Sequence, residues 1–158
     1  MALYVRARLT KSRIHQTRFT SLVTQVLSAV GESESELSVE LVGDRRMRRL
    51  NHLYRRKDRT TDVLAFAMRE SDSPCSALLG DVVISVPTAR RQASQAGRSL
   101  DEELIVLLIH GVLHLCGYDH ERGEREAARM QRRERAILKA LRPLPSLVAG
   151  VTTTKRNR

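Results

Sequence analysis

The chain has 158 residues, enough for one domain with a buried core and too few for two full domains. It has 28 basic and 18 acidic residues, a net charge of +10, and 41% of its residues are hydrophobic. No uncharged apolar stretch can span a bilayer, no signal peptide is visible, and only two cysteines are present, so we expect a cytoplasmic protein that needs neither a membrane nor disulfides.

The positive charge indicates a polyanionic partner. Four of the 28 basic residues are lysines and the other 24 are arginines, whose planar guanidinium holds a phosphate with two hydrogen bonds. Codon bias in a GC-rich genome would explain the preference for arginine over lysine, but it would not explain the excess of positive charge. Aromatic residues make up only 3% of the chain, so binding through rows of stacked bases is not expected.

Strands and helices are interspersed along the first half of the chain. Alternating apolar residues predict strands at residues 3–8 and 35–43. Between them, a helical stripe of apolar residues runs from residue 17 to Gly31, a residue type that commonly ends helices. Asp44 is expected to be the N-cap of a second helix. We expect the buried face of that helix to comprise Met47, Leu50, Leu53 and Tyr54.

The second half of the chain contains the most apolar predicted helix. Two strands are expected at residues 62–68 and 78–85, separated by a turn-rich loop. Pro87 is expected in the first turn of a helix that ends near residue 96. Residues 101–116 are apolar on nearly every side, which predicts a central buried helix. A last, strongly charged helix is expected at residues 121–141.

These elements predict an α+β fold in which one mixed sheet of about four strands is packed by about five helices. We expect residues 1–142 to form a single domain. Two prolines, Pro143 and Pro145, stop the last helix, and residues 143–158 are expected to be a flexible basic C-terminal tail.

Three of the five histidines lie in the segment His110-Gly-Val-Leu-His114-Leu-Cys-Gly117-Tyr-Asp-His120. His110 and His114 are four residues apart on a predicted helix, so their side chains project from one face. A left-handed residue at Gly117 would turn the chain back and bring His120 to them. Three nitrogen ligands leave a fourth position open, which is typical of a catalytic zinc site. The alternative is three core or capping histidines without a metal, and burying them unpaired on an apolar helix would be costly.

This spacing fits the metzincin protease signature H-E-x-x-H-x-x-G-x-x-H at every position but one. Gly111 replaces the glutamate that acts as the general base in peptide hydrolysis. The sequence therefore predicts a metzincin-like metal-binding helix in a catalytic domain that lacks the glutamate base of the proteases, which disfavours peptide hydrolysis.

The same segment, HGVLHLCGYDH, followed by Glu126, Met130 and Glu134, resembles the signature of the YbeY family of bacterial endoribonucleases. Residues 51–66 resemble the family's N-x-x-Y-R-x-K-D-x-P-T-D-V-L-S-F, and residues 79–84 resemble its L-G-D-I-x-I strand. The motifs occur in the family's order. Three positions depart from them: Thr60 stands in place of proline, Ala65 in place of serine, and Ala67 in place of a frequent proline.

The resemblance implies a metal-dependent endoribonuclease that cuts single-stranded RNA. It implies a role in the 3′-end maturation of small-subunit ribosomal RNA and in ribosome quality control, with the ribosome or its small-subunit proteins as partners. DNA is not expected as a partner. The implied cofactor is one Zn²⁺ per chain, because three imidazoles favour zinc over magnesium.

Site residues follow from the resemblance together with the chemistry of the side chains. The expected metal ligands are His110, His114 and His120, with His114 and Arg55 as catalytic residues. Arg55 would neutralise charge that develops on the phosphate in the transition state, although a solvated arginine at a helix end is the alternative. Arg55, Lys57 and Arg59 are expected to bind the RNA backbone, and the last two are equally compatible with plain surface charges.

Two points about this site stay open from the sequence. Asp119, beside His120, is a candidate to orient a ligand histidine. No carboxylate is obviously adjacent to the ligands, so the general base is unassigned. Two rival functions also remain: a non-catalytic RNA-binding ribosome assembly factor with a structural zinc, and a zinc hydrolase with a peptide or small-molecule substrate.

Overall fold

The computed structural model describes residues 3–7, 14–68 and 77–148. Its centre is a four-stranded sheet with the strand order β1-β2-β4-β3. Strands β1, β2 and β4 are parallel, and β3 pairs antiparallel with β4 at the edge. The strand bounds are β1 Leu3–Ala7, β2 Glu36–Val42, β3 Val63–Ala67 and β4 Leu78–Ser85. The α+β fold with one mixed sheet, predicted from the sequence, is confirmed.

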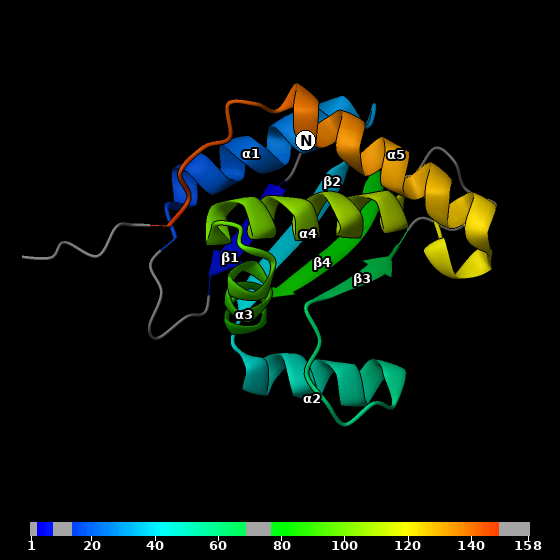
Figure 1. The fold of residues 1–158 in the computed structure, drawn as a ribbon. Coiled ribbons are helices and arrows are strands. Elements are labelled where there is room, and N and C mark those ends of the chain that lie inside the picture. The colour runs from blue at the N-terminus through cyan, green and yellow to red at the C-terminus, as the bar shows by residue number, and fades with distance from the viewer. Residues whose placement is uncertain (1–2, 8–13, 69–76, 149–158) are drawn as a thin grey trace, which may run out of the picture.

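Five α-helices and one short 3-10 helix pack around this sheet. Their bounds are α1 Gln16–Ala29, α2 Asp44–Arg55, α3 Val86–Ala96, α4 Leu100–Leu115, η1 His120–Arg122 and α5 Glu124–Ala140. Helices α1, α4 and α5 lie on one side of the sheet and α2 lies on the other (Figure 1). Helix α4 is the central buried helix that was expected, and its apolar residues join the main core. None of the described helices is both long enough and apolar enough to cross a membrane.

Helix α2 buries fewer apolar residues than the sequence predicted. Met47 is fully buried, but Leu53 and Tyr54 are 67% and 62% exposed, so their assignment to the buried face was wrong. Asn51 is buried instead, and its side-chain amide donates a hydrogen bond to the Arg59 carbonyl at 2.8 Å. The face of the sheet under α2 offers only a small apolar cluster, and Tyr54 contacts it at its margin, edge-to-face with the Phe66 ring at a centroid distance of 5.1 Å, while most of its own ring stays exposed.

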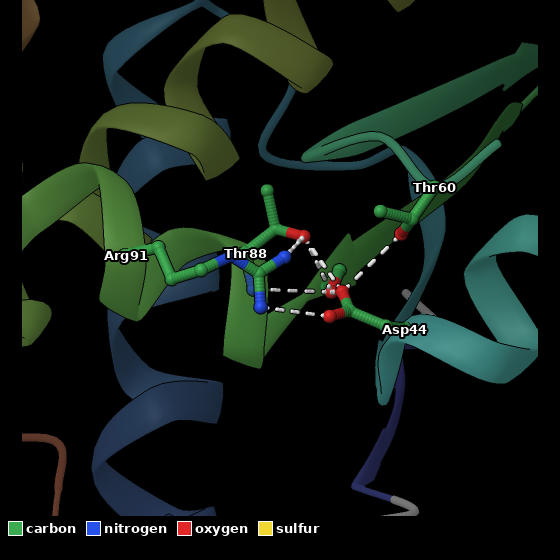
Figure 2. Close-up of polar contacts among 5 residues, drawn as sticks. Asp44, Thr60, Thr88 and Arg91 are labelled. Atoms are coloured by element: carbon green, nitrogen blue, oxygen red, sulfur yellow. Dashed lines mark hydrogen bonds and ion pairs between the residues drawn. The ribbon is translucent and has the colours of Figure 1, made fainter.

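Asp44 also differs from its predicted role as an N-cap. Gly43 is the N-cap of α2 and Asp44 is the first residue of the helix. Oδ1 of Asp44 accepts hydrogen bonds from the hydroxyls of Ser85 and Thr88, both at 2.6 Å, and Arg91 forms an ion pair with Oδ2 at 2.9 Å. Figure 2 shows how this carboxylate joins α2 to the β4–α3 junction.

We expect Asp44 to make stability depend on pH in the acid range. Burial alone would raise its pKa, but the hydrogen bonds from Ser85, Thr88 and Arg91 and the charge of Arg91 lower it to about 2 from 3.8. The ionised form therefore stabilises the fold fully above pH 3.8, and this contribution is lost as the pH falls through about 2. Asp44→Asn should cost about 1–2 kcal/mol at pH 7, and roughly half of that at pH 3, allowing for solvent screening.

Urea unfolding of the wild type and of Asp44→Asn, at pH 7 and at pH 3, measures the loss in the free energy of unfolding at each pH. Asp58→Asn is the control, because Asp58 is 62% exposed and pairs with Arg48 at the surface. An Asp44→Asn loss that equals the Asp58→Asn loss, or that does not change with pH, would contradict the expectation.

The start of the expected C-terminal tail is packed against the domain. Leu147 is fully buried, and the backbone N–H groups of Leu147 and Val148 donate to Asp101 Oδ1 at 2.8 and 2.9 Å. Ile14 forms a β-bridge with Val148. The predicted flexible tail is therefore wrong for residues 143–148. Residues 149–158, and the turn-rich loop expected between β3 and β4 at residues 70–76, lie outside the described residues.

Candidate metal centre

The three histidines of the 110–120 segment lie together. His110 and His114 lie one turn apart on α4, and their Nε2 atoms are 3.1 Å apart. His120, from η1, places Nδ1 3.2 Å from Nε2 of His114. One nitrogen from each ring lies within 4.8 Å of the others. The three histidines could therefore hold a metal ion.

A turn at the end of α4 brings His120 to the other two histidines. Gly117 has a φ of +95°, a left-handed conformation that favours glycine. The N–H of Tyr118 returns to the Leu113 carbonyl at 3.0 Å, and the Asp119 carboxylate accepts the Glu121 N–H at 2.9 Å, which caps η1. The predicted turn at Gly117 is confirmed. The single helix predicted from residue 121 is interrupted, because Gly123 at φ +124° separates η1 from α5.

The surroundings of His114 favour its neutral form. Burial, followed by the proximity of His110 and His120, lowers the pKa of its imidazole. A neutral imidazole has a free lone pair, which is the form that binds a metal. The chemistry of three converging imidazole nitrogens thus fits a transition-metal ion.

The histidines line a cleft of about 520 Å³. Arg55, at the end of α2, lines the same cleft, together with residues of β3 and of the 117–122 turn. Lys57 does not line it, and Arg59 lies instead in a separate surface depression beside the start of α2. The structure thus brings Arg55 together with the three histidines, and it leaves Lys57 and Arg59 outside the cleft.

Comparison with known proteins shows the family of this chain. The model of the family described as Endoribonuclease YbeY matches residues 4–142. The chain belongs to the YbeY family. Endoribonuclease YbeY of Geobacter metallireducens is 44% identical over 144 residues, covering 89% of this chain and 96% of that protein. The YbeY of Aquifex aeolicus is 42% identical over 137 residues, covering 87% and 91%.

A solved structure shows the same fold. The solution structure of TM1509 from Thermotoga maritima has a TM-score of 0.63 and 24% sequence identity to this chain, and the match covers 87% of each chain. The family model and the two relatives confirm the YbeY resemblance that the motifs suggested, and the solved structure supports the fold.

The missing protease glutamate has a packing explanation in this YbeY-family chain. Gly111 is buried where α4 crosses the sheet. A Cβ atom at this position would lie 2.8 Å from Val82 Cγ1 and 3.3 Å from Val63 Cγ2. A glutamate side chain has no room there, so the position that supplies the base in metzincins faces the sheet in this chain.

Glu134, which the sequence offered only as a residue of the family signature with no assigned role, contacts the cluster. Oε1 of Glu134, on α5, lies 2.5 Å from Nδ1 of His110. Asp119, which was expected to orient a ligand, pairs with Arg122 at 3.3 Å and caps η1. The signal for Glu134 in the sequence was its place in the family signature, but nothing local to it indicated that its carboxylate would contact His110.

One departure from the YbeY motif has a visible effect. Thr60 replaces the family's proline, and its hydroxyl donates to Asp44 Oδ1 at 3.2 Å (Figure 2). This bond ties the loop that follows Arg55 to the network around Asp44. The replacement therefore substitutes a tertiary hydrogen bond for the rigidity of a proline.

Proposed function

We propose that this chain is a zinc-dependent endoribonuclease that cleaves single-stranded RNA in the cleft of the three histidines. The observation that carries the proposal is the convergence of His110, His114 and His120 in a cleft that Arg55 also lines. The three histidines would hold one zinc ion per chain and leave a position open. When bound there, zinc would polarise a phosphodiester oxygen and lower the pKa of water.

Arg55 is proposed to act on the scissile phosphate. Its side chain is exposed at the cleft, and within the described ranges it forms no ion pair with an acidic side chain. A guanidinium that is free of carboxylates can form two hydrogen bonds with a phosphate and offset the negative charge that grows in the transition state. His114, at the centre of the cluster, is proposed as the second catalytic residue through its role as a ligand.

Residues outside the cleft are proposed to bind the flanking RNA. Lys57 and Arg59 are exposed and lie two and four residues after Arg55 in the chain. Contacts between these two side chains and phosphates outside the cleft would position the RNA strand without reading its bases. The net charge of +10 supports a polyanionic substrate.

The biological substrate is proposed from the family. We infer that the chain acts in the cytoplasm on the 3′ end of small-subunit ribosomal RNA, in maturation and ribosome quality control, with the ribosome or its small-subunit proteins as partners. The membership of an endoribonuclease family and the basic composition support this inference.

Cleavage of a fluorescent single-stranded RNA tests the proposal. We expect cleavage to stop after chelation, to return with added zinc, and to fall at least about tenfold between 50 and 200 mM salt because RNA binding releases counterions. The duplex of the same sequence and the matching DNA strand serve as controls and should remain uncut. Cleavage that survives chelation would contradict the proposal, and salt-insensitive activity on an uncharged substrate would favour a different zinc hydrolase.

A further inference from the structure

We propose that Glu134 is a positioning residue for the metal centre, acting through the imidazole of His110. This inference rests on the zinc site of the proposed function. The two nitrogens of the His110 ring have different neighbours: Nδ1 lies 2.5 Å from Glu134 Oε1, and Nε2 lies 3.1 Å from Nε2 of His114. Glu134 therefore contacts the side of the ring that faces away from the other histidines.

This contact selects the form of His110 that can bind a metal. A neutral imidazole has a proton on one nitrogen and a lone pair on the other. A carboxylate accepts a hydrogen bond and cannot donate one when ionised, so Glu134 holds the proton of His110 on Nδ1. The lone pair then lies on Nε2, which faces His114 and His120. A carboxylate behind a ligand histidine also fixes the angle of the ring and makes the ligand nitrogen more basic.

The packing of α5 holds Glu134 in this place. Met130, one turn before it, and Ile137, one turn after it, are 1% and 2% exposed. The guanidinium of the neighbouring Arg133 donates to the Ala29 carbonyl at 2.9 Å, which ties α5 to α1. The carboxylate therefore has little freedom to leave His110.

The burial of the pair indicates that the contact is more than a surface ion pair. The side chains of His110 and Glu134 are 27% and 22% exposed. Within the described ranges, His110 is the one polar partner that the structure gives to the Glu134 carboxylate. A largely buried carboxylate without a partner is costly, so its presence on the buried stripe of α5 is explained by its contact with His110.

Zinc affinity, measured by competition with a chromogenic chelator, tests the inference. We expect Glu134→Ala to weaken zinc binding by about 10- to 100-fold. Glu134→Gln should weaken it less, because the amide oxygen can still accept from Nδ1–H. Glu126→Gln is the matched control: Glu126 lies on the same helix, pairs with Arg129, and should leave the affinity unchanged.

A spectroscopic measurement separates positioning from a merely structural role. In long-range ¹H–¹⁵N spectra of the metal-free full chain, we expect His110 to carry its proton on Nδ1 in the wild type and in Glu134→Gln. In Glu134→Ala the proton should shift toward Nε2, while thermal melts of all three proteins show that each is folded.

The outcomes separate this inference from the proposed function. Wild-type protein that takes up no zinc would overturn both. If the wild type binds zinc and the zinc affinity of Glu134→Ala lies within about twofold of the wild-type value, the inference alone would be overturned. An unchanged tautomer of His110 in Glu134→Ala would also overturn it.

Discussion

Replacing His114 with alanine is expected to abolish both zinc binding and RNA cleavage. His114 is the central member of the cluster, since its Nε2 lies 3.1 Å from a nitrogen of His110 and 3.2 Å from a nitrogen of His120. Without His114, the other two histidines supply only two nitrogens and cannot complete a three-nitrogen site. We expect the zinc content to fall from about one per chain to nearly none, and cleavage to fall more than about a hundredfold.

Elemental analysis of the purified proteins, followed by cleavage assays, measures this loss. His15→Ala is the control, because His15 is exposed before α1 and does not line the cleft. A His114→Ala protein that keeps one zinc per chain would show that the metal is held elsewhere. A variant that is free of metal and still cleaves RNA would remove the metal from the mechanism.

The parts of this site that were predicted correctly depend on short-range patterns. The spacing of His110 and His114 by four residues places them on one helix face, and a glycine at position 117 allows the left-handed turn that returns His120. The alternation along β2 and the apolar run of α4 are equally local. Such patterns are determined by backbone geometry within one or two turns, so they can be recognised without knowledge of the fold.

The parts that were missed depend on contacts between distant segments. Glu134 reaches His110 across 24 residues because α5 packs on α4, and Asp101 holds the backbone of Leu147 across 46 residues. Nothing near Leu147 in the sequence indicates that its N–H donates a hydrogen bond to the carboxylate of Asp101, at the start of α4. Periodicity alone does not reveal which helix faces which.

Helix α2 illustrates a second limit. Its apolar residues have helical spacing, yet Leu53 and Tyr54 are exposed and Asn51 is buried. Spacing shows which residues share a face, but it does not show how large an apolar surface the neighbouring sheet offers to that face. Because the cluster under α2 is small, a buried amide that binds the Arg59 carbonyl is accommodated there.

Replacing Arg55 with alanine is expected to reduce turnover much more than RNA binding. Arg55 is the arginine of α2 that lines the histidine cleft, so its charge acts where the scissile phosphate would lie. The loss of one well-placed donor to a transition state typically lowers kcat by about 10²- to 10³-fold. The loss of one phosphate contact among several should weaken RNA binding by less than about tenfold and make it slightly less sensitive to salt.

Single-turnover cleavage and RNA affinity, measured on the same proteins, separate these two effects. Arg55→Lys keeps the charge but loses the planar fork, so it should recover binding and only part of the rate. Arg49→Ala is the matched control, because Arg49 lies on the same helix, is exposed, and does not line the cleft.

If Arg55→Ala and Arg49→Ala weaken binding equally and neither changes the rate, Arg55 is an ordinary surface charge. If the wild type binds RNA without cleaving it, and Arg55→Ala only weakens that binding, the chain is an assembly factor. A selective loss of rate in Arg55→Ala would place the scissile phosphate between the guanidinium and the three histidines, as a nuclease requires.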